Sequence, residues 1–322
     1  MSVLITGVAG FIGSNLARKI LSNGIYVFGI DNLSNGNFAN ISDLNYSTSF
    51  SFKQVEMTNF ESYQTAFNYF HNINPITEVW HFAANSNIPA GINDLTLDLN
   101  DTFITTINTL RLMQANNIRI IAFASSSAIY GDLGDCPLVE DIGPLLPISN
   151  YGAMKLSSEA TISAATENNI NQAFIFRFPN VVGVPATHGV ILDFIHKLKA
   201  SPDNLVVLGN GTQTKEYLHI DDLIDAMLYI RDRAVDKLAY FNIGTGDGGV
   251  TVRFIAEETV RIFAPYASIS YGNGNKGWIG DVPRFKYSIN KLKSLGWIPK
   301  MSSKDAVTKA IQEITTQVLK SK

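Results

Sequence analysis

The stretch Thr6-Gly7-Val8-Ala9-Gly10-Phe11-Ile12-Gly13 lies near the start of this 322-residue chain, directly after an apolar run at residues 3–5. Between a strand and a helix, its glycines have distinct uses. Gly7 permits a tight turn, Gly10 permits the backbone to approach a pyrophosphate, and Gly13 permits close packing of helix on sheet. The amino terminus of the helix then faces the anion. The pattern predicts a dinucleotide-binding turn, and a purely structural glycine turn is the alternative.

Short apolar runs and helical patterns alternate through the first half of the chain, which is typical of a parallel sheet covered by helices. The predicted strands are residues 2–6, 25–30, 50–55, 78–82, 119–124 and 173–178. One predicted helix begins after Gly10, and the others span residues 59–71, 97–116 and 151–168. After Pro179 the periodicity is less regular.

These patterns predict an α/β fold with two domains. We expect a Rossmann-type doubly wound parallel sheet in residues 1–178, to which part of 214–246 returns. Residues 179–322 are expected to form a smaller C-terminal α/β region that binds the substrate.

An acidic residue stands at the end of the second predicted strand. Asp31 follows the run Tyr26–Ile30 and lies eighteen residues after Gly13. A carboxylate here accepts hydrogen bonds from both hydroxyls of an adenosine ribose and repels a 2′-phosphate. The sequence therefore predicts NAD rather than NADP as the cofactor, and an ordinary Asp-Asn turn is the alternative.

A tyrosine and a lysine lie four residues apart in the segment Tyr151-Gly152-Ala153-Met154-Lys155, after a serine triplet at 125–127. At this spacing on a helix the two side chains share a face, so the ammonium lies near both the phenol and a bound cofactor. A free phenol titrates near pH ~10, and a neighbouring cation stabilises its phenolate. The pair indicates an oxidoreductase site, and a surface helix pair is the alternative.

Composition argues against several other classes of protein. The formal net charge is −3, and no basic run or zinc-ligand spacing points to nucleic acid or to a metal. Met1-Ser2 is followed at once by Val3–Thr6, which leaves no room for a secretory signal, and no apolar stretch is long enough to span a bilayer. We expect a cytosolic protein without a membrane partner. Cys136 is the only cysteine, which excludes an internal disulfide.

Further motifs follow in a characteristic order. They are His81-Phe82-Ala83-Ala84, Ser125–Gly131, Arg177-Phe178-Pro179-Asn180, Phe241–Gly244 and Gly280–Arg284. With the glycine motif, Asp31 and Tyr151–Lys155, they resemble the extended short-chain dehydrogenases/reductases of the nucleotide-sugar epimerase and dehydratase family. The resemblance extends over nearly the whole chain.

The resemblance implies a role for each matching residue. Tyr151 is the expected base, Lys155 the expected ribose ligand and modulator of the phenol pKa. Ser126 is expected to bond the sugar oxygen, because it lies four residues before Tyr130. Glu56 matches the acid that contacts adenine. The implied cofactor contacts are Gly7, Gly10, Phe11, Ile12, Gly13, Asp31, Asn32, Glu56, Met57, Phe82, Ala83, Ala84, Tyr151 and Lys155.

The same resemblance implies where the nucleotide sugar binds. Asn180 matches the residue that holds the diphosphate, although an asparagine capping a turn is the alternative. His188 lies in the segment 187–191, which is expected to offer backbone contacts, and a polar loop residue is its simpler interpretation. The implied substrate contacts are Ser127, Asn180, His188, Val190, Lys215, Tyr217, Trp278 and Asp281.

Three departures from the family pattern bear on the substrate. The usual Asn-x-x-Gly-Thr is replaced by Thr102–Thr106, and Lys215-Glu216-Tyr217 stands in place of Arg-Asp-Tyr. Trp278 stands where an arginine usually grips the diphosphate, and an indole cannot replace a guanidinium there. The candidates to compensate are Lys215, Lys276 and Arg284.

The residues after Ser126 narrow the reaction. The 4,6-dehydratases of the family carry an aspartate and a glutamate there, because loss of water needs a further acid and base. This chain has Ser127 and Ala128. Oxidation and reduction at a carbinol remain, and an epimerase needs nothing more. We expect a C4 epimerase that uses NAD to form a transient 4-keto sugar from a UDP-hexose.

Two other functions stay open. One is a nucleotide-sugar 4-dehydrogenase or 4-ketoreductase on another sugar nucleotide, such as a GDP-linked heptose. The other is a sensor that binds NAD without catalysis. We also expect a homodimer through the apolar positions of Leu99–Met113 and Ala153–Ala165, although these could equally cover the sheet.

The cofactor prediction has a direct test. The purified protein is expected to bind NAD with a lower Kd than NADP, because the Asp31 carboxylate repels the 2′-phosphate. Titration calorimetry with each dinucleotide measures the ratio. A ratio that favours NADP would contradict the role assigned to Asp31.

Overall fold

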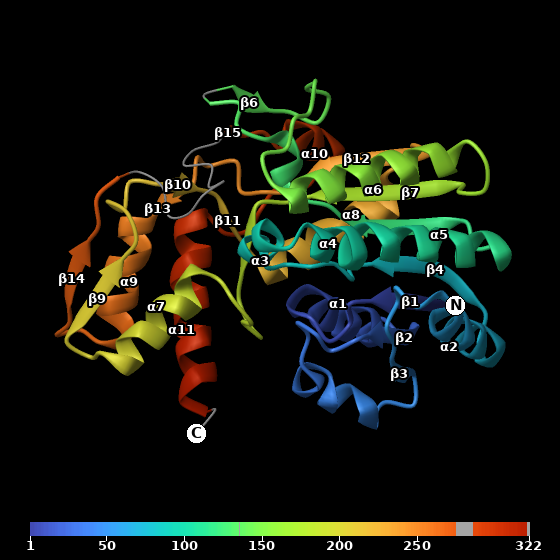
Figure 1. The fold of residues 1–322 in the computed structure, drawn as a ribbon, viewed down its shortest axis with the longest axis horizontal. Coiled ribbons are helices and arrows are strands. Elements are labelled where there is room, and N and C mark those ends of the chain that lie inside the picture. Colours follow the sequence, from blue (N-terminus) through green and yellow to red (C-terminus); the bar gives the residue numbers. More distant parts are fainter. Residues whose placement is uncertain (135, 275–285, 321–322) are drawn as a thin grey trace. The chain divides into compact units, whose positions relative to one another are not determined.

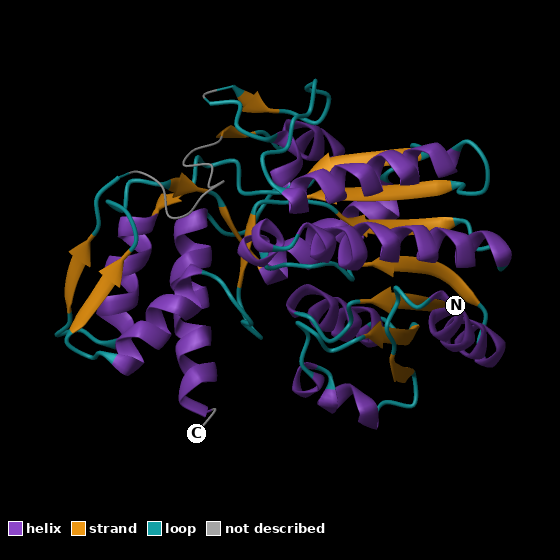
Figure 2. Cartoon of the chain, in the orientation of Figure 1, coloured by secondary structure: helices purple, strands orange, loops and turns teal. Residues whose placement is uncertain are grey.

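The computed structural model describes residues 1–134, 136–274 and 286–320, which form two compact units. Unit 1 comprises Met1–Gly131, Pro144–Arg177 and Met227–Phe241. Unit 2 comprises Asp132–Gly143, Phe178–Ala226 and Asn242–Lys322. The chain therefore passes between the units several times. Figure 1 follows its course, and Figure 2 distinguishes the helices from the strands.

A seven-stranded sheet forms the centre of unit 1, in the order β12-β7-β5-β4-β1-β2-β3. The pairs from β3 to β7 are all parallel, and Thr6 in β1 lies opposite both Ile30 in β2 and His81 in β4. The carboxyl ends of these three strands therefore meet at one edge of the sheet. The strands are β1 (Ser2–Thr6), β2 (Tyr26–Asp31), β3 (Phe50–Gln54), β4 (Ile76–His81), β5 (Ile120–Ala124), β7 (Gln172–Arg177) and β12 (Leu238–Asn242).

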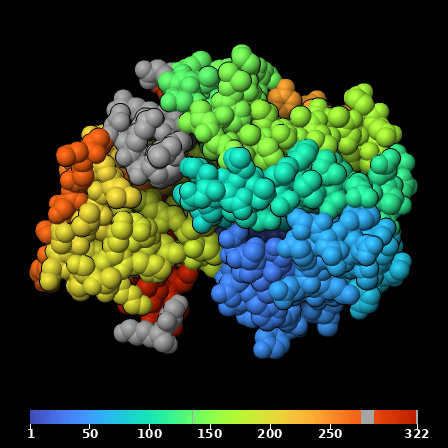
Figure 3. Space-filling model, viewed as in Figure 1, coloured from blue at the N-terminus to red at the C-terminus, as the bar shows by residue number. Residues whose placement is uncertain are grey.

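Helices cover the sheet because their apolar residues recur at helical spacing. In α2 the buried residues are Tyr63, Ala66, Phe67 and Phe70, which lie on one face. The helices of unit 1 are α1 (Phe11–Ser22), α2 (Phe60–Ile73), α3 (Ile88–Asn93), α4 (Leu95–Asp98), α5 (Thr105–Ala115), α6 (Asn150–Thr166) and the second half of α8 (Ile220–Arg233), with short turns η1 (Phe38–Asn40), η2 (Ser42–Tyr46) and η4 (Ser127–Tyr130). In Figure 3 the atoms of α3 to α6 form a teal and green layer over one face of this unit.

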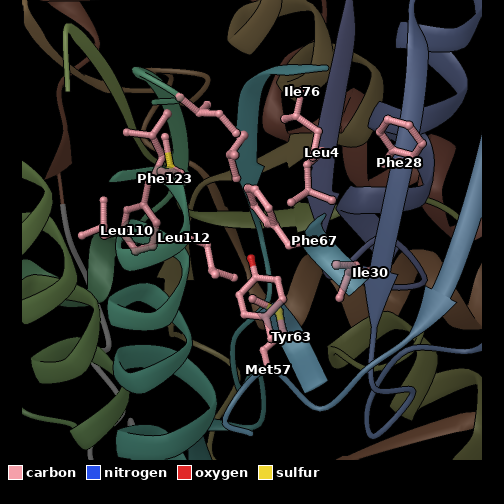
Figure 4. Packing of buried hydrophobic residues seen from close by; sticks show 14 of the residues in the cluster. Leu4, Phe28, Ile30, Met57, Tyr63, Phe67, Ile76, Leu110, Leu112 and Phe123 are labelled. Atoms are coloured by element: carbon pink, nitrogen blue, oxygen red, sulfur yellow. The ribbon is translucent and has the colours of Figure 1, made fainter. Parts of the chain in front are cut away.

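The main core of unit 1 lies between the sheet and these helices. Phe28 of β2 stacks on Phe70 of α2 with ring centroids 4.6 Å apart. Figure 4 shows side chains from β1, β2, α2 and α5 pointing toward one another, among them Leu4, Phe67 and Leu112. The apolar positions Leu110, Leu112 and Met113 belong to this cluster. They therefore cover the sheet, which was the alternative to a role in dimer contact.

The six predicted strands are confirmed, and so are the helices predicted after Gly10 and at 59–71 and 151–168, with ends shifted by at most two residues. The helix predicted at 97–116 is also confirmed, but it is not a uniform α-helix. It is divided into α4, a π-helical segment η3 (Leu99–Ile104) and α5. The Thr102 carbonyl accepts bonds from the hydroxyls of Thr105 and Thr106, at 3.1 and 2.8 Å. Such hydroxyl bonds compete with the backbone and bend a helix.

Unit 2 is built from two-stranded pairs and helices, which explains the irregular periodicity after Pro179. The pairs are β6 (Pro137–Leu138) with β15 (Lys286–Tyr287), β8 (Asn180–Val182) with β11 (Tyr217–His219), β9 (Asn204–Val207) with β14 (Ser268–Tyr271), and β10 (Thr214–Lys215) with β13 (Val250–Thr251). The helices are α7 (Val190–Ala200), the first half of α8, α9 (Val252–Phe263), α10 (Asn290–Leu295) and α11 (Ser303–Lys320). Helices α7, α9 and α11 enclose its core. That this unit binds the sugar nucleotide stays a prediction.

A buried ion pair joins α6 to β7 within unit 1. Arg177 Nη2 lies 2.7 Å from Glu159 Oε2, and both side chains are at most 8% exposed. Arg177 also donates to the Tyr130 hydroxyl at 3.0 Å, and Glu159 accepts a bond from the Ser125 hydroxyl. Removal of one partner would leave the other charge buried and unpaired.

Substitution Arg177→Met is therefore expected to lower the free energy of unfolding by about 3–5 kcal/mol. Arg18→Met is the matched control, because Arg18 pairs with Asp43 at the surface, and its loss should cost at most about 1 kcal/mol. Urea unfolding followed by circular dichroism measures both. Equal effects of the two substitutions would contradict the structural role of the buried pair.

Candidate active site

The glycine turn begins where β1 ends. Gly7 has φ +70°, a conformation that favours glycine, and a β-carbon on it would lie 2.7 Å from the Ala83 amide nitrogen. A β-carbon on Gly13 would lie 2.2 Å from the Gly7 carbonyl oxygen. Both positions therefore exclude any larger residue. The turn brings backbone of β1, α1 and the segment after β4 into direct contact.

Gly10 differs from the other two glycines. It caps α1 with an ordinary extended conformation, and a β-carbon there would meet only the Gly7 carbonyl oxygen within 4 Å, at 3.2 Å. The space in front of Gly10 and the amino terminus of α1 is therefore open to a ligand. Phe11 and Ile12 open that helix and are half-buried. The chemistry of this turn fits an anion such as a pyrophosphate.

Asp31 lies at the end of β2 with its carboxylate fixed by the neighbouring backbone. Oδ2 accepts a bond from the Ala9 amide at 2.9 Å, and Oδ1 accepts one from the Leu33 amide at 2.8 Å. Burial raises the Asp31 pKa, while the two amide bonds lower it. Each oxygen keeps a further lone pair, which fits the two hydroxyls of a ribose. Gly36 leaves room there, since a β-carbon on it would lie 3.0 Å from both oxygens.

Asn32 and Glu56 are also brought together. Asn32 donates from Nδ2 to Glu56 Oε2 at 2.9 Å, and Glu56 Oε1 accepts the Thr58 amide at 3.1 Å. Both side chains therefore shape the surface beside Asp31. Met57 is 3% exposed and lies in the core cluster of unit 1.

A network of polar side chains links the ends of β1 and β4. The sequence did not predict a role for these side chains. Thr6 Oγ1 accepts bonds from the Phe82 and Ala83 amides, both at 3.2 Å, so its proton points to His81 Nδ1 at 2.8 Å. Because Nδ1 is then the acceptor, the single N–H proton of the neutral imidazole is on Nε2, which donates to Thr106 Oγ1 at 3.0 Å. Burial, and then the charge of Lys155, lower the His81 pKa to about 3. The imidazole is neutral and structural.

This network reaches the helix of the predicted catalytic pair. Thr106 Oγ1 and Ser158 Oγ lie 3.1 Å apart, and Ser158 stands one turn after Lys155 on α6. The half-buried segment Phe82–Ala84 is thus held between the glycine turn and this network. The only sequence signal was the placement of polar residues at strand ends and on one face of a helix.

Ser126 and Tyr151 are brought together by two helix starts. Ser126 caps η4 and accepts the Ala128 amide at 3.2 Å, and Ser149 caps α6 by accepting the Gly152 amide at 3.1 Å. A β-carbon on Gly152 would lie 2.5 Å from the Ala128 carbonyl oxygen, so the two starts are in contact. The Ser126 side chain lies near Tyr151, where it lowers the pKa of the phenol against the effect of burial.

Burial shifts both members of the tyrosine and lysine pair toward their neutral forms. It raises the pKa of Tyr151 to about 12, with Asp98 acting in the same direction and the Ser126 side chain opposing it. Burial lowers the pKa of Lys155 to about 7, against the charges of Glu159 and Asp98. The Lys155 Nζ atom donates to the Ala124 carbonyl at 2.6 Å and lies 5.8 Å from the centre of the Tyr151 ring. A phenol with this pKa is protonated at neutral pH.

The predicted substrate contacts Asn180 and Tyr217 lie opposite each other in unit 2, where β8 pairs with β11. Asn180 is exposed and donates from Nδ2 to the Glu216 carbonyl at 3.4 Å. The Tyr217 side chain is 5% exposed and packs in the core of unit 2. The sequence pattern did not distinguish these two environments.

The other predicted substrate contacts are dispersed. Ser127 lies in η4 of unit 1 and is half-buried. His188 is exposed, and its Nδ1 atom lies 3.0 Å from the Thr187 hydroxyl. Val190 opens α7, and Lys215 pairs with Val250 in the strand pair of β10 and β13. The remaining positions, which are Trp278 and Asp281 with Lys276 and Arg284, lie outside the described residues.

The structure also bears on metal ligands and on membrane spans. Within the described part of the chain, no group of three His, Cys, Asp or Glu side chains is placed to hold a metal ion. Among the helices of those same residues, none is long and apolar enough to cross a membrane.

Curated relatives resemble this chain along almost its whole length. A UDP-glucuronate 4-epimerase from Thermodesulfobacterium geofontis is 26% identical over 318 residues, which cover 96% of this chain and 94% of the relative. A putative UDP-glucose 4-epimerase from Methanocaldococcus jannaschii is 28% identical over 314 residues, which cover 96% and 97%.

A solved structure agrees with this likeness. The UDP-glucose 4-epimerase of Thermus thermophilus in complex with NAD is 26% identical and has a TM-score of 0.84, with 98% of this chain and 99% of that chain covered. The α/β fold class predicted from the sequence is confirmed. The family model described as NAD dependent epimerase/dehydratase family matches residues 3–244. The resemblance seen in the motifs is thereby confirmed, and the chain belongs to the NAD dependent epimerase/dehydratase family.

Proposed function

We propose that this protein is a nucleotide-sugar 4-epimerase that acts on a UDP-hexose. The observation that carries the proposal is the arrangement of Ser126, which caps η4, with Tyr151 and Lys155 on the first turns of α6, where Lys155 Nζ donates to the carbonyl of Ala124 at the end of β5. The 4-epimerase names of the relatives support it, as does their coverage of the whole chain. NAD, when bound, would accept a hydride from the sugar carbon and return it.

The residues of this chain would bind and orient the reactants and move one proton. The glycine turn and Asp31 would hold the dinucleotide, and Asn32, Glu56 and Phe82–Ala84 would border it. Tyr151 would take the proton of the sugar 4-hydroxyl and give it back, and Ser126 would hold the same oxygen through its hydroxyl. Lys155 would hold ribose hydroxyls and favour the phenolate by its charge.

The protonation state of Tyr151 needs a further contribution. With a pKa of about 12, the phenol cannot act as a base at neutral pH. The positive charge of the oxidised nicotinamide, placed beside the ring, would add to that of Lys155 and lower the phenol pKa. The base would therefore form in the loaded protein.

The side chains after Ser126 favour epimerisation over loss of water. Ser127 and Ala128 supply neither an acid nor a base, and dehydration across two carbons needs both. The site would therefore support only transfer of hydride and of the hydroxyl proton. If the 4-keto sugar turned its opposite face toward the cofactor before the hydride returned, the product would be the C4 epimer.

One observation favours a second candidate. Trp278 stands at the position of the diphosphate-binding arginine of the family, so a different sugar nucleotide is compatible with this chain. A 4-dehydrogenase or 4-ketoreductase would use the same Ser126, Tyr151 and Lys155 but would stop at, or start from, the 4-keto sugar. An NAD-binding sensor would need none of these three side chains, and their presence argues against it.

We also propose that the protein is cytosolic and forms a homodimer through η3, α5 and α6. Leu99 at the start of η3 is 39% exposed, and Ile107, Met154 and Leu156 are partly exposed on α5 and α6. These side chains, rather than the buried Leu110 to Met113, are the apolar groups available to a second copy.

The reaction is tested by proton NMR of the purified protein mixed with UDP-glucose, UDP-galactose or their N-acetyl forms, without added cofactor. We expect signals of the C4 epimer to appear, because an epimerase regenerates its cofactor in each turnover and retains it. No conversion, together with NADH released on denaturation, would contradict an epimerase of these sugars and favour the dehydrogenase.

Substitution Tyr151→Phe is expected to lower kcat by roughly 100- to 10,000-fold, the range of general acid–base catalysis. Wild-type activity should fall as the pH falls through the pKa of Tyr151 in the loaded protein, because the protonated phenol cannot accept a proton. Steady-state rates across pH measure both effects. Tyr46→Phe is the control, since this ring is 92% exposed, and a fully active Tyr151→Phe variant would refute the role of the phenol.

A further inference from the structure

Asp98, the last residue of α4, carries a carboxyl group that the proposed reaction does not use. The residue is fully buried, and its Oδ1 atom accepts a bond from Asn85 Nδ2 at 2.8 Å. Its Oδ2 atom is buried and has no hydrogen-bond partner among the residues of the structure. A buried carboxylate oxygen without a partner is unfavourable, so the position calls for an explanation beyond folding.

The carboxyl group lies directly on the backbone of α3. A β-carbon on Gly91 would lie 1.9 Å from Asp98 Oδ2, so only glycine fits there. The Gly91 carbonyl in turn accepts a bond from Asn150 Nδ2 at 2.8 Å, and Asn150 directly precedes Tyr151. A chain of contacts thus runs from Asp98 through α3 to the first turn of α6.

The helices that carry these groups pack together. Both α3 and α4 contact α6, and Figure 1 shows the three helices within unit 1. Asn85, which holds Asp98, is itself fixed, because its amide donates to Thr102 Oγ1 at 3.2 Å and its Oδ1 accepts the Asn87 amide at 2.9 Å. The orientation of the Asp98 carboxyl is therefore determined on two sides.

The charge of Asp98 acts on both members of the catalytic pair. It raises the pKa of Lys155 against the effect of burial, and it raises the pKa of Tyr151. Burial raises the pKa of Asp98 itself, while Asn85 and Lys155 lower it. The titratable groups around these three are Glu159 on α6, Asp101 on η3 and the neutral His81 of β4.

We propose that Asp98 is a positioning residue for the Tyr151 and Lys155 pair, which it orients through Gly91 and Asn150 and whose ammonium it stabilises as a buried counter-charge. This inference rests on the proposed function. It assigns to Asp98 no contact with the substrate.

Asp98→Asn is the decisive variant, because it removes the charge and keeps the shape and the bond from Asn85. Loss of the anion should lower the Lys155 pKa by roughly one unit, a tenfold change in the ratio of amine to ammonium. Carbon-13 NMR of lysine-labelled protein measures this titration without substrate, with the Lys155 signal identified by its loss in Lys155→Arg. An unchanged titration would overturn the proposal.

The pH profile of turnover gives a second readout. Both limbs of the profile should move to lower pH in Asp98→Asn, because removal of an anion lowers the pKa of the phenol and of the ammonium alike. A merely structural role would instead lower the rate by the same factor at every pH, and that result would also overturn the proposal. Asp101→Asn, one turn further along and half-buried, is the matched control and should move neither limb.

Gly91→Ala tests the same contact from the other side, and it serves if Asp98→Asn fails to fold. The added methyl displaces the carboxyl group and should shift the Lys155 titration in the same direction. An unshifted Lys155 titration in a folded Gly91→Ala protein would overturn the proposal. If no sugar nucleotide is turned over, the proposed function fails, while the NMR titration still decides the action of Asp98 on Lys155.

Discussion

Backbone packs directly on backbone where β1 ends, and this contact requires two positions without side chains. At Gly7 a β-carbon would meet the amide of Ala83, and at Gly13 it would meet the carbonyl of Gly7. Because the contact is so close, the turn, the start of α1 and the exit of β4 form one rigid assembly. The Ala9 amide of the same turn holds Asp31. The edge of the sheet that would face the cofactor therefore requires glycine at both of these positions.

Several buried charged residues of unit 1 lie on α6 or beside it. Glu159 is shared, since it pairs with Arg177 at 2.7 Å and accepts a bond from the Ser125 hydroxyl. Among the described residues, Lys155 forms no ion pair as close as this one, and its Nζ atom donates to the Ala124 carbonyl instead. An ammonium in such a place is poorly compensated, which is why its pKa falls to about 7. The strong pair stabilises the fold, whereas the weak one leaves Lys155 close to titration at neutral pH.

How far the sequence predicts this structure depends on the range of the interaction. The alternation of apolar runs and helical patterns predicted the parallel sheet. The glycine turn, Asp31 and the spacing of Tyr151 and Lys155 are local patterns, and with the other motifs they predicted the family. The π-helical segment at 99–104 was not predicted, because it depends on which backbone carbonyls accept hydrogen bonds from the Thr105 and Thr106 hydroxyls. Asp98 was missed because only the fold places its carboxyl on Gly91, seven residues earlier. Tyr217 shows the same limit, because a motif match does not indicate which side of a strand is buried.

The protonation state of Tyr151 bears on why the proposed cofactor would be retained. With a pKa of about 12 the phenol is neutral, so its ionisation and the binding of a cation beside it would favour each other. This coupling is reciprocal, because a ligand that stabilises the phenolate is itself bound more tightly by the phenolate. In the proposed reaction, a sugar hydroxyl proton passing to Tyr151 would remove the phenolate charge, and the hydride that NAD would accept would remove the positive charge of the cofactor. The two charges would therefore appear and disappear together, and the site would remain matched to the cofactor in both of its redox states, as an enzyme that never exchanges its cofactor requires.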